Sequence, residues 1–217
     1  MPVDEITIGA RLRTLRHGRG KTMPRAGSWG RTMDAAERTA TTLEAQVRSY
    51  RVGIHVLGQL TLTVALAAAV AQNGGAAAHW LNEADRLANR VTDDPAHGWH
   101  SFSKTNVSVW GVAVGVERGE SGQWVRGLAS RVDQAKLSAR KSRLASFRCD
   151  VGPGLAREQQ TRVEAVRWLR RAEDTTPQRV RNSPSVRETV AYLLNQATLA
   201  AGGRELRGMA ARMGLPH

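Results

Sequence analysis

The chain has 217 residues, of which 41% are hydrophobic and 5% aromatic, and its 32 Lys and Arg outnumber 19 Asp and Glu for a formal charge of +13 at pH 7. The apolar residues are mostly alanine, valine and leucine, which favours closely packed helices and disfavours a β-sandwich. One cysteine, Cys149, excludes an intrachain disulfide and a cysteine zinc site and suits a reducing cytoplasm. The charge permits nucleic acid or acidic partners, although excess arginine with abundant alanine and glycine also follows from a GC-rich coding sequence.

The N-terminal residues 1–23 predict one short helix. Ile8, Leu12 and Leu15 fall on one helical face, whereas the arginines among them fall mostly elsewhere: Arg11, Arg13 and Arg16. Residues 18–22, GRGKT, lack the earlier glycine and the preceding strand of a phosphate-binding loop. They therefore indicate the turn that ends the helix.

Residues 8–23, IGARLRTLRHGRGKTM, resemble the opening helix and first turn of Xre-type helix-turn-helix transcriptional regulators of high-GC bacteria. In that family a second helix and a recognition helix follow, and the recognition helix enters the major groove of DNA. Here residues 24–40, PRAGSWGRTMDAAERTA, stand in their place. We therefore expect a helix-turn-helix remnant with its linker at 1–32, followed by a TPR-like helical repeat domain at 33–217.

Residues 33–50 predict a polar helix, and residues 52–71 predict a second helix that has no charged side chain. An uncharged helix of this length could span a bilayer. His55, Gln59 and the alanine-rich second half instead favour the covered first helix of a helical hairpin. Its tight turn is expected at residues 73–75, NGG, and its second helix at 76–91.

The rest of the chain predicts a loop and three further helix pairs. The loop covers 93–106, where His97 and His100 have a metal-like separation but lack the other ligands of a zinc site. The pairs are expected at 105–134, at 138–174, and at 185–200 with 204–213. Residues 152–154, GPG, are expected to kink or break the first helix of the middle pair, and Pro184 fits the first turn of a helix.

A spacing of small, large and small residues recurs along these helices. Ala165, Leu169 and Ala172 stand at intervals of four and three, with Pro177 beyond them in the expected turn. Small residues let a neighbouring helix approach closely, and this spacing is typical of the second helix of a tetratricopeptide (TPR) repeat. The same intervals recur in two other expected second helices: Ala77, Leu81 and Ala84, and Val125, Ala129 and Val132. The expected first helices of the three pairs carry small and apolar residues at matching positions: Val64, Ala65 and Ala68; Val112, Ala113 and Val116; and Val151, Gly152 and Leu155. We therefore predict an all-α, TPR-like stack of antiparallel hairpins.

Several phrases of the C-terminal part resemble the TPR-like effector domain of Xre-type regulators. They include residues 102–110, FSKTNVSVW, and residues 161–194, TRVEAVRWLRRAEDTTPQRVRNSPSVRETVAYLL. The resemblance covers about residues 55–214. It implies an effector-sensing or dimerising role for this part of the chain.

A stack of hairpins leaves a concave groove lined by first helices, which can accept an extended peptide or a partner's helix. The candidate groove residues are polar or aromatic side chains on first helices: Gln59, Asn106, Trp110 and Asn195. The side chain of Asn106 can donate to and accept from a peptide backbone at once. Its alternative role is to cap the N-terminus of a helix, beside Thr105.

A second candidate surface is basic. Arg167, Arg170 and Arg171 occupy neighbouring helical positions and could bind phosphates, as could the N-terminal arginines at positions 11, 13 and 16. The alternative is a solvated surface whose arginines pair with nearby carboxylates: Glu158, Glu164, Glu173 and Asp174.

The sequence has no catalytic arrangement, cofactor motif or metal-binding motif, so we expect a protein that is not an enzyme. The leading hypothesis is a cytoplasmic, regulator-like protein whose TPR-like domain binds a peptide, a small effector or a partner subunit, with homodimerisation left open. One alternative is a functional DNA-binding regulator that uses residues 1–30 and the arginine surface. Another is a small membrane-associated protein held by residues 52–71.

Overall fold

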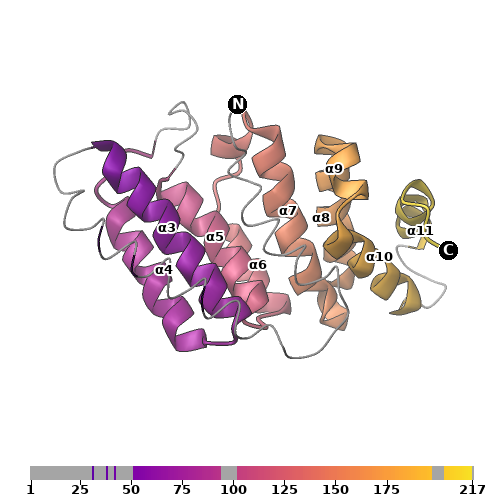
Figure 1. Ribbon diagram of the computed structural model, residues 1–217. Coiled ribbons are helices and arrows are strands. Elements are labelled where there is room, and N and C mark those ends of the chain that lie inside the picture. Colours follow the sequence, from indigo (N-terminus) through magenta and orange to yellow (C-terminus); the bar gives the residue numbers. More distant parts are fainter. Residues whose placement is uncertain are drawn as a thin grey trace. The chain divides into compact units, whose positions relative to one another are not determined.

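A computed structural model describes residues 51–93, 102–196 and 203–216, together with the isolated residues Arg31, Arg38 and Thr42. These residues are all-α: they form nine α-helices and two short 3-10 helices, and no strand occurs among them (Figure 1). The predicted helix-turn-helix remnant, the domain boundary at 32/33 and the loop histidines His97 and His100 lie outside the described residues. Of the predicted helix 33–50, only Arg38 and Thr42 are described, and both are helical.

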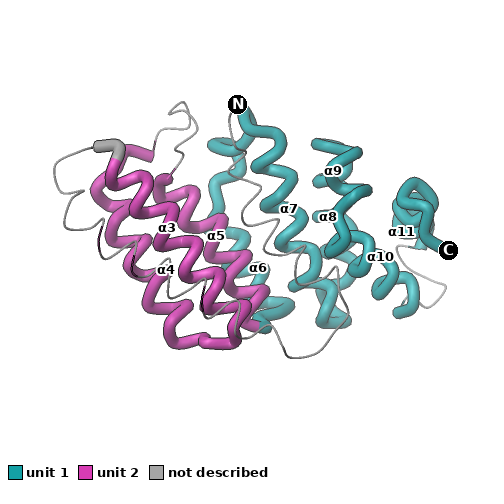
Figure 2. The backbone as a smooth tube through the Cα atoms, viewed as in Figure 1, with its two compact units in different colours: residues 1–20, 119–217 teal, residues 21–118 magenta. Residues whose placement is uncertain are grey.

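The chain divides into two compact units, and the boundary falls between Arg118 and Gly119 (Figure 2). In unit 2 the structure describes α3 (Arg51–Val70), α4 (Gly74–Ala88) and α5 (Lys104–Glu117). Unit 1 holds α6 (Gly122–Ser130), α7 (Lys141–Ala156), α8 (Arg162–Thr175), α9 (Pro177–Arg181), α10 (Pro184–Gln196) and α11 (Gly203–Arg212).

The first hairpin, α3 with α4, forms as predicted, but its turn lies earlier than the glycines suggested. The backbone N–H of Asn73 donates to the carbonyl of Ala68, a bond that closes the C-terminus of α3, and Gln72 adopts a positive φ of 61° there. The side chain of Asn73 then caps α4 by accepting from the N–H of Ala76. Gly74 and Gly75 are therefore the first residues of α4 and not the turn.

Helix α3, which carries no charged side chain after its first residue Arg51, is the core helix of unit 2. Its window Gly53–Val70 has a mean hydropathy of 1.7, so by length and composition it could cross a membrane, and more than half of this window is buried inside the structure. Helices α4 and α5 pack against it. Phe102, just before α5, packs so closely on α3 that a Cβ on Gly58 would lie 2.5 Å or less from three ring carbons. This apolar surface therefore has partners within the chain, as in the core helix of a soluble protein.

In unit 1, helices α7 and α8 form a hairpin that is joined by the 3-10 helix Gln159–Thr161 (Figure 1). The predicted break at residues 152–154 is wrong, because α7 runs through Pro153 to Ala156. A proline normally disfavours helical backbone at the residue before it by clashing with that residue's Cβ. Gly152 has no Cβ, and one there would also lie 2.7 Å from Cγ of Leu169 on α8. One glycine thus keeps α7 helical and lets α8 approach.

The remaining boundaries show two differences from prediction. Pro177 does not lie in a simple turn, because it starts the short helix α9, and Pro184 starts α10 as predicted. The expected loop at 93–106 ends sooner, since α5 begins at Lys104. The residues of the small–large–small pattern are buried at every position except Leu81, which is partly buried.

Candidate functional site

Two polar side chains of α5 are buried without any hydrogen-bond partner. Asn106 is only 4% exposed, and neither its Nδ2 nor its Oδ1 is bonded; Trp110 is 9% exposed, and its Nε1–H is also unbonded. Residues four apart on a helix share a face, so the two unpaired groups lie one turn apart. Trp110 belongs to the buried cluster that α3, α4 and α5 form together. An unpaired buried polar group costs about 1–3 kcal/mol, and this site carries three such atoms.

Asn106 is not the helix cap that its position allowed. Ser103 is the N-cap of α5, and its hydroxyl accepts a hydrogen bond from the backbone N–H of Asn106. Asp93 accepts from both the backbone N–H and the hydroxyl of Thr105. The start of α5 is therefore capped by other groups, and the carboxamide of Asn106 contributes nothing to it.

The other two candidate groove residues differ from this pair. Gln59 lies on α3 in the same unit and is partly buried, whereas Asn195 lies on α10 in unit 1 and is exposed. The structure thus brings Asn106 and Trp110 onto one helical face and places Asn195 in the other unit. Of the four candidate groove residues, only Asn106 and Trp110 lie on the same helix, and the groove itself stays a prediction.

The arginines of α8 separate into two groups. Arg170 bonds Glu173 at 3.2 Å, pairs with Asp174 and lies 3.9 Å from Glu205 of α11. Arg167 and Arg171 are exposed and form no ion pair among the described residues. Of the three α8 arginines predicted to contact phosphate, only Arg170 is therefore ion-paired within the described part of the chain. Arg11, Arg13 and Arg16 lie outside the described residues.

Glu173 is the centre of a buried ion-pair cluster that the sequence did not reveal. Its side chain is 1% exposed, and its two carboxylate oxygens accept bonds from arginines of three helices. Arg181 of α9 donates from Nε at 2.8 Å, and Arg212 of α11 donates from Nε at 2.9 Å and from Nη2 at 2.7 Å. Arg170 of α8 completes the set. The sequence named Glu173 only as one of four carboxylates that could pair with arginines on a solvated surface, and its place one turn after Leu169 was the signal that it is buried.

These arginines keep the buried carboxyl of Glu173 ionised. Burial alone would raise the pKa of its carboxyl, but the hydrogen bonds and charges of Arg212 and Arg181 outweigh burial and lower the pKa from 4.5 to about 2. The same bond raises the pKa of Arg212. Helices α8, α9 and α11 are therefore joined through one ionised carboxylate.

We expect unit 1 to lose stability in acid because of this carboxylate. A lowered pKa stabilises the folded state above the unfolded value of 4.5, and this contribution disappears as pH falls from 4.5 towards 2. The shift corresponds to about 3 kcal/mol. Urea unfolding at pH 7, 4.5 and 2.5 measures the decline, and the Glu173→Gln variant should lack this component. Parallel pH profiles for the two proteins would contradict the expectation.

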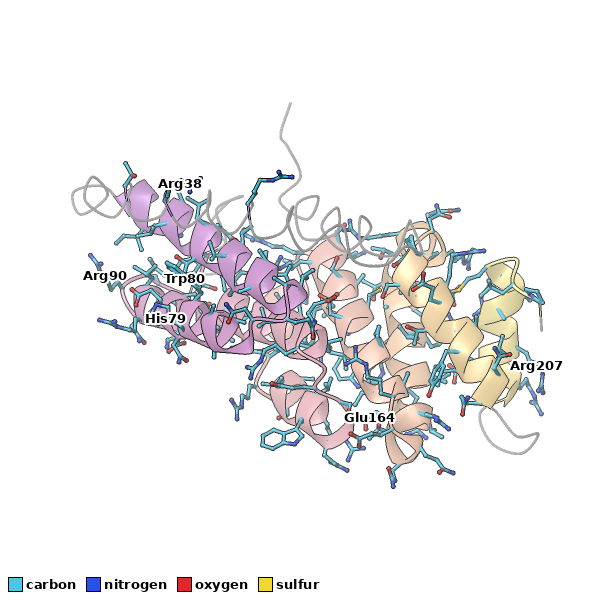
Figure 3. The ribbon with its side chains drawn as sticks, turned by 60° about the horizontal axis from the view of Figure 1, so that its bottom comes forward. Arg38, His79, Trp80, Arg90, Glu164 and Arg207 are labelled. Carbon is cyan, nitrogen blue, oxygen red and sulfur yellow. The ribbon has the colours of Figure 1, made fainter. Side chains whose placement is uncertain are left out.

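A smaller polar chain links α6 to α8. Glu164 of α8, labelled in Figure 3, accepts from Nε of Arg126 on α6 at 2.8 Å and from Nε1 of Trp168 at 3.3 Å. Trp168 in turn packs edge-on against the buried ring of Phe147 on α7. Glu164 is thus a structural carboxylate, as the solvated-surface alternative predicted for part of the arginine-rich region.

No group of three metal-ligating side chains occurs among the residues that the structure describes. Comparisons with protein-family models, with curated protein sequences and with solved structures returned no match. The fold and the two sites above define the class: an all-α protein built of helical hairpins, with an unpaired polar face on α5 and a charged cluster at the C-terminal end.

Proposed function

We propose that the protein binds a peptide through α5 of unit 2 and performs no chemistry on it. The observation that carries the proposal is the pair Asn106 and Trp110, whose amide and indole groups are buried without partners. Native proteins satisfy most buried polar groups, so such exceptions call for a reason. A ligand that completes these hydrogen bonds supplies one.

The chemistry of the two side chains favours a peptide backbone. A carboxamide offers a donor and an acceptor side by side, which matches the carbonyl and N–H of one peptide unit, and the indole N–H one turn away can donate to a second carbonyl. Stacked helical repeats offer extended concave surfaces for binding. Because the unpaired atoms are covered, the peptide must displace part of the surrounding structure as it binds.

The resemblance of residues 55–214 to the effector domain of Xre-type regulators supports a role in transcription regulation, with the bound peptide as the signal or as a segment of a partner subunit. In this proposal residues 33–217 are the TPR-like domain and residues 1–32 the remnant of a DNA-binding head. The protein then acts in the cytoplasm of a bacterium.

Asn106→Leu should stabilise the protein by about 1–3 kcal/mol and abolish peptide binding. Leucine has a similar shape without unpaired polar atoms, so the folded state no longer carries their desolvation cost. The probe is a peptide selected from a displayed random library on the wild-type protein. Calorimetric titration and urea unfolding give the two readouts, and we expect at least a tenfold loss of affinity.

Asn195→Leu is the matched control, since Asn195 is exposed on α10 and should change stability by no more than about 0.5 kcal/mol. It should leave peptide affinity unchanged. If Asn106→Leu bound the selected peptide as tightly as the wild type, or if the library yielded no binder, the proposed site would be rejected.

A further inference from the structure

Unit 1 carries most of the chain's positive charge. From residue 119 onward there are 18 Lys and Arg against nine Asp and Glu. Part of this excess is neutralised internally, since Glu173, Asp174 and Glu164 are each bound by arginine. The question is where the remaining guanidinium groups gather.

Two of the exposed arginines, Arg167 and Arg171, lie on one face of α8. Arg167 and Arg171 are four residues apart, so they share a face of α8 and are separated by about 6 Å along the helix axis. Both are exposed, and neither has an ion pair in the described ranges. Arg170, between them in sequence, is held by Glu173 and Asp174 and faces the ion-pair cluster. On α8, therefore, Arg170 is neutralised by carboxylates, whereas Arg167 and Arg171 are not neutralised by any carboxylate that the structure describes.

Arg148 of α7 joins this face from the neighbouring helix. Its Nη1 donates to the carbonyl of Arg171 at 3.1 Å and to the hydroxyl of Thr175 at 2.9 Å, and its Nε donates to Gln134 at 3.2 Å. Burial and then the nearby charge of Arg171 lower the pKa of Arg148, with only Asp174 opposing them. Arg148 is therefore anchored to the backbone of Arg171 within reach of its charge, and a bound anion would offset the repulsion between the two arginines.

We propose that Arg148, Arg167 and Arg171 form a phosphate-binding surface that contacts the backbone of nucleic acid. The planar fork of arginine matches phosphate oxygens in a bidentate manner. Two forks one helical turn apart on a rigid helix can engage successive phosphates of one strand. Binding of a helix to a lipid surface is strengthened by apolar side chains beside the cations, and among the exposed large hydrophobic residues α8 contributes only Val163.

This surface would supply affinity and positioning without reading sequence, because phosphate contacts carry no base information. It is independent of the peptide site, since its residues lie in unit 1 and Asn106 lies in unit 2. Asn106→Leu should therefore leave nucleic-acid binding unchanged. Either proposal can fail while the other stands.

The test measures binding of the full chain to a fluorescently labelled 30-base-pair duplex by anisotropy between 50 and 200 mM salt. The double variant Arg167→Glu with Arg171→Glu should bind at least tenfold more weakly at 100 mM salt. The slope of log affinity against log salt should fall in magnitude by about two, since each lost phosphate contact removes about 0.9 from it. Far-ultraviolet circular dichroism verifies that the variant stays folded.

Arg204→Glu with Arg207→Glu on α11 is the matched control, because it makes the same change in net charge at two exposed positions (Figure 3 labels Arg207). It should weaken binding by less than threefold. Equal losses in the two double variants would show that only total charge matters and would overturn the proposal. It would also be overturned if the duplex did not bind at 50 mM salt, or if vesicles with anionic lipid bound at these arginines and the duplex did not.

Discussion

Glu173→Gln is expected to lower the free energy of unfolding by about 3–5 kcal/mol at pH 7. The change keeps the shape of the side chain but leaves Arg170, Arg181 and Arg212 without their shared negative charge. The lowered pKa of Glu173, about 2, corresponds to about 3 kcal/mol of stabilisation that the neutral side chain cannot provide. The three guanidinium groups, whose side chains are 30–37% exposed, would also repel one another around the neutral amide. Urea unfolding followed by circular dichroism measures the loss.

Asp174→Asn is the control for this experiment, because Asp174 is the next residue along, pairs with the same Arg170, and is 56% exposed. Exposed ion pairs contribute about 0–1 kcal/mol. A loss above 3 kcal/mol for Glu173→Gln and below 1 kcal/mol for Asp174→Asn would locate the effect in the buried cluster. Equal and small losses would show that Glu173 is solvated and that its arginines do not join α8, α9 and α11.

The helices of this chain could be predicted from the sequence because apolar residues, small and large, recur on one face of each helix. Ala165, Leu169 and Ala172 are fully buried as their spacing predicted. The charged residues gave no comparable signal. Glu173 and Asp174 are neighbours of the same charge class, yet one is buried and one is exposed, because the partners Arg181 and Arg212 come from helices that only the folded chain brings together.

The candidate site was readable in part. The sequence named Asn106 and Trp110 as candidate groove residues, and it left a capping role open for Asn106. In the folded chain Ser103 is that cap, and the carboxamide of Asn106 has no hydrogen-bond partner among the described residues. Residues 152–154 were read as a kink or break, although Gly152 has no Cβ for Pro153 to clash with. The sequence could not show that the same glycine also gives room to Leu169 of α8, because that contact joins two helices.

The second large effect is expected where Phe102 packs on α3. Phe102→Ala should cost about 3–5 kcal/mol, because the ring is 1% exposed and its removal leaves a cavity. Gly58→Ala should cost about 1–3 kcal/mol in the wild-type chain, since the new methyl group would lie 2.5 Å or less from three atoms of a rigid ring. Urea unfolding of both single variants and of the double variant completes the cycle.

The sign of the Gly58→Ala effect should reverse when Phe102 is already alanine. Without the ring there is no clash, and replacing a glycine within a helix then stabilises by about 1 kcal/mol. The two mutations should therefore be coupled by about 2–4 kcal/mol, at or above the upper end of the usual range for residues in contact. If Gly58→Ala had the same effect in both backgrounds, Phe102 would not lie against α3, and the start of α5, with Asn106 four residues further on, would pack elsewhere.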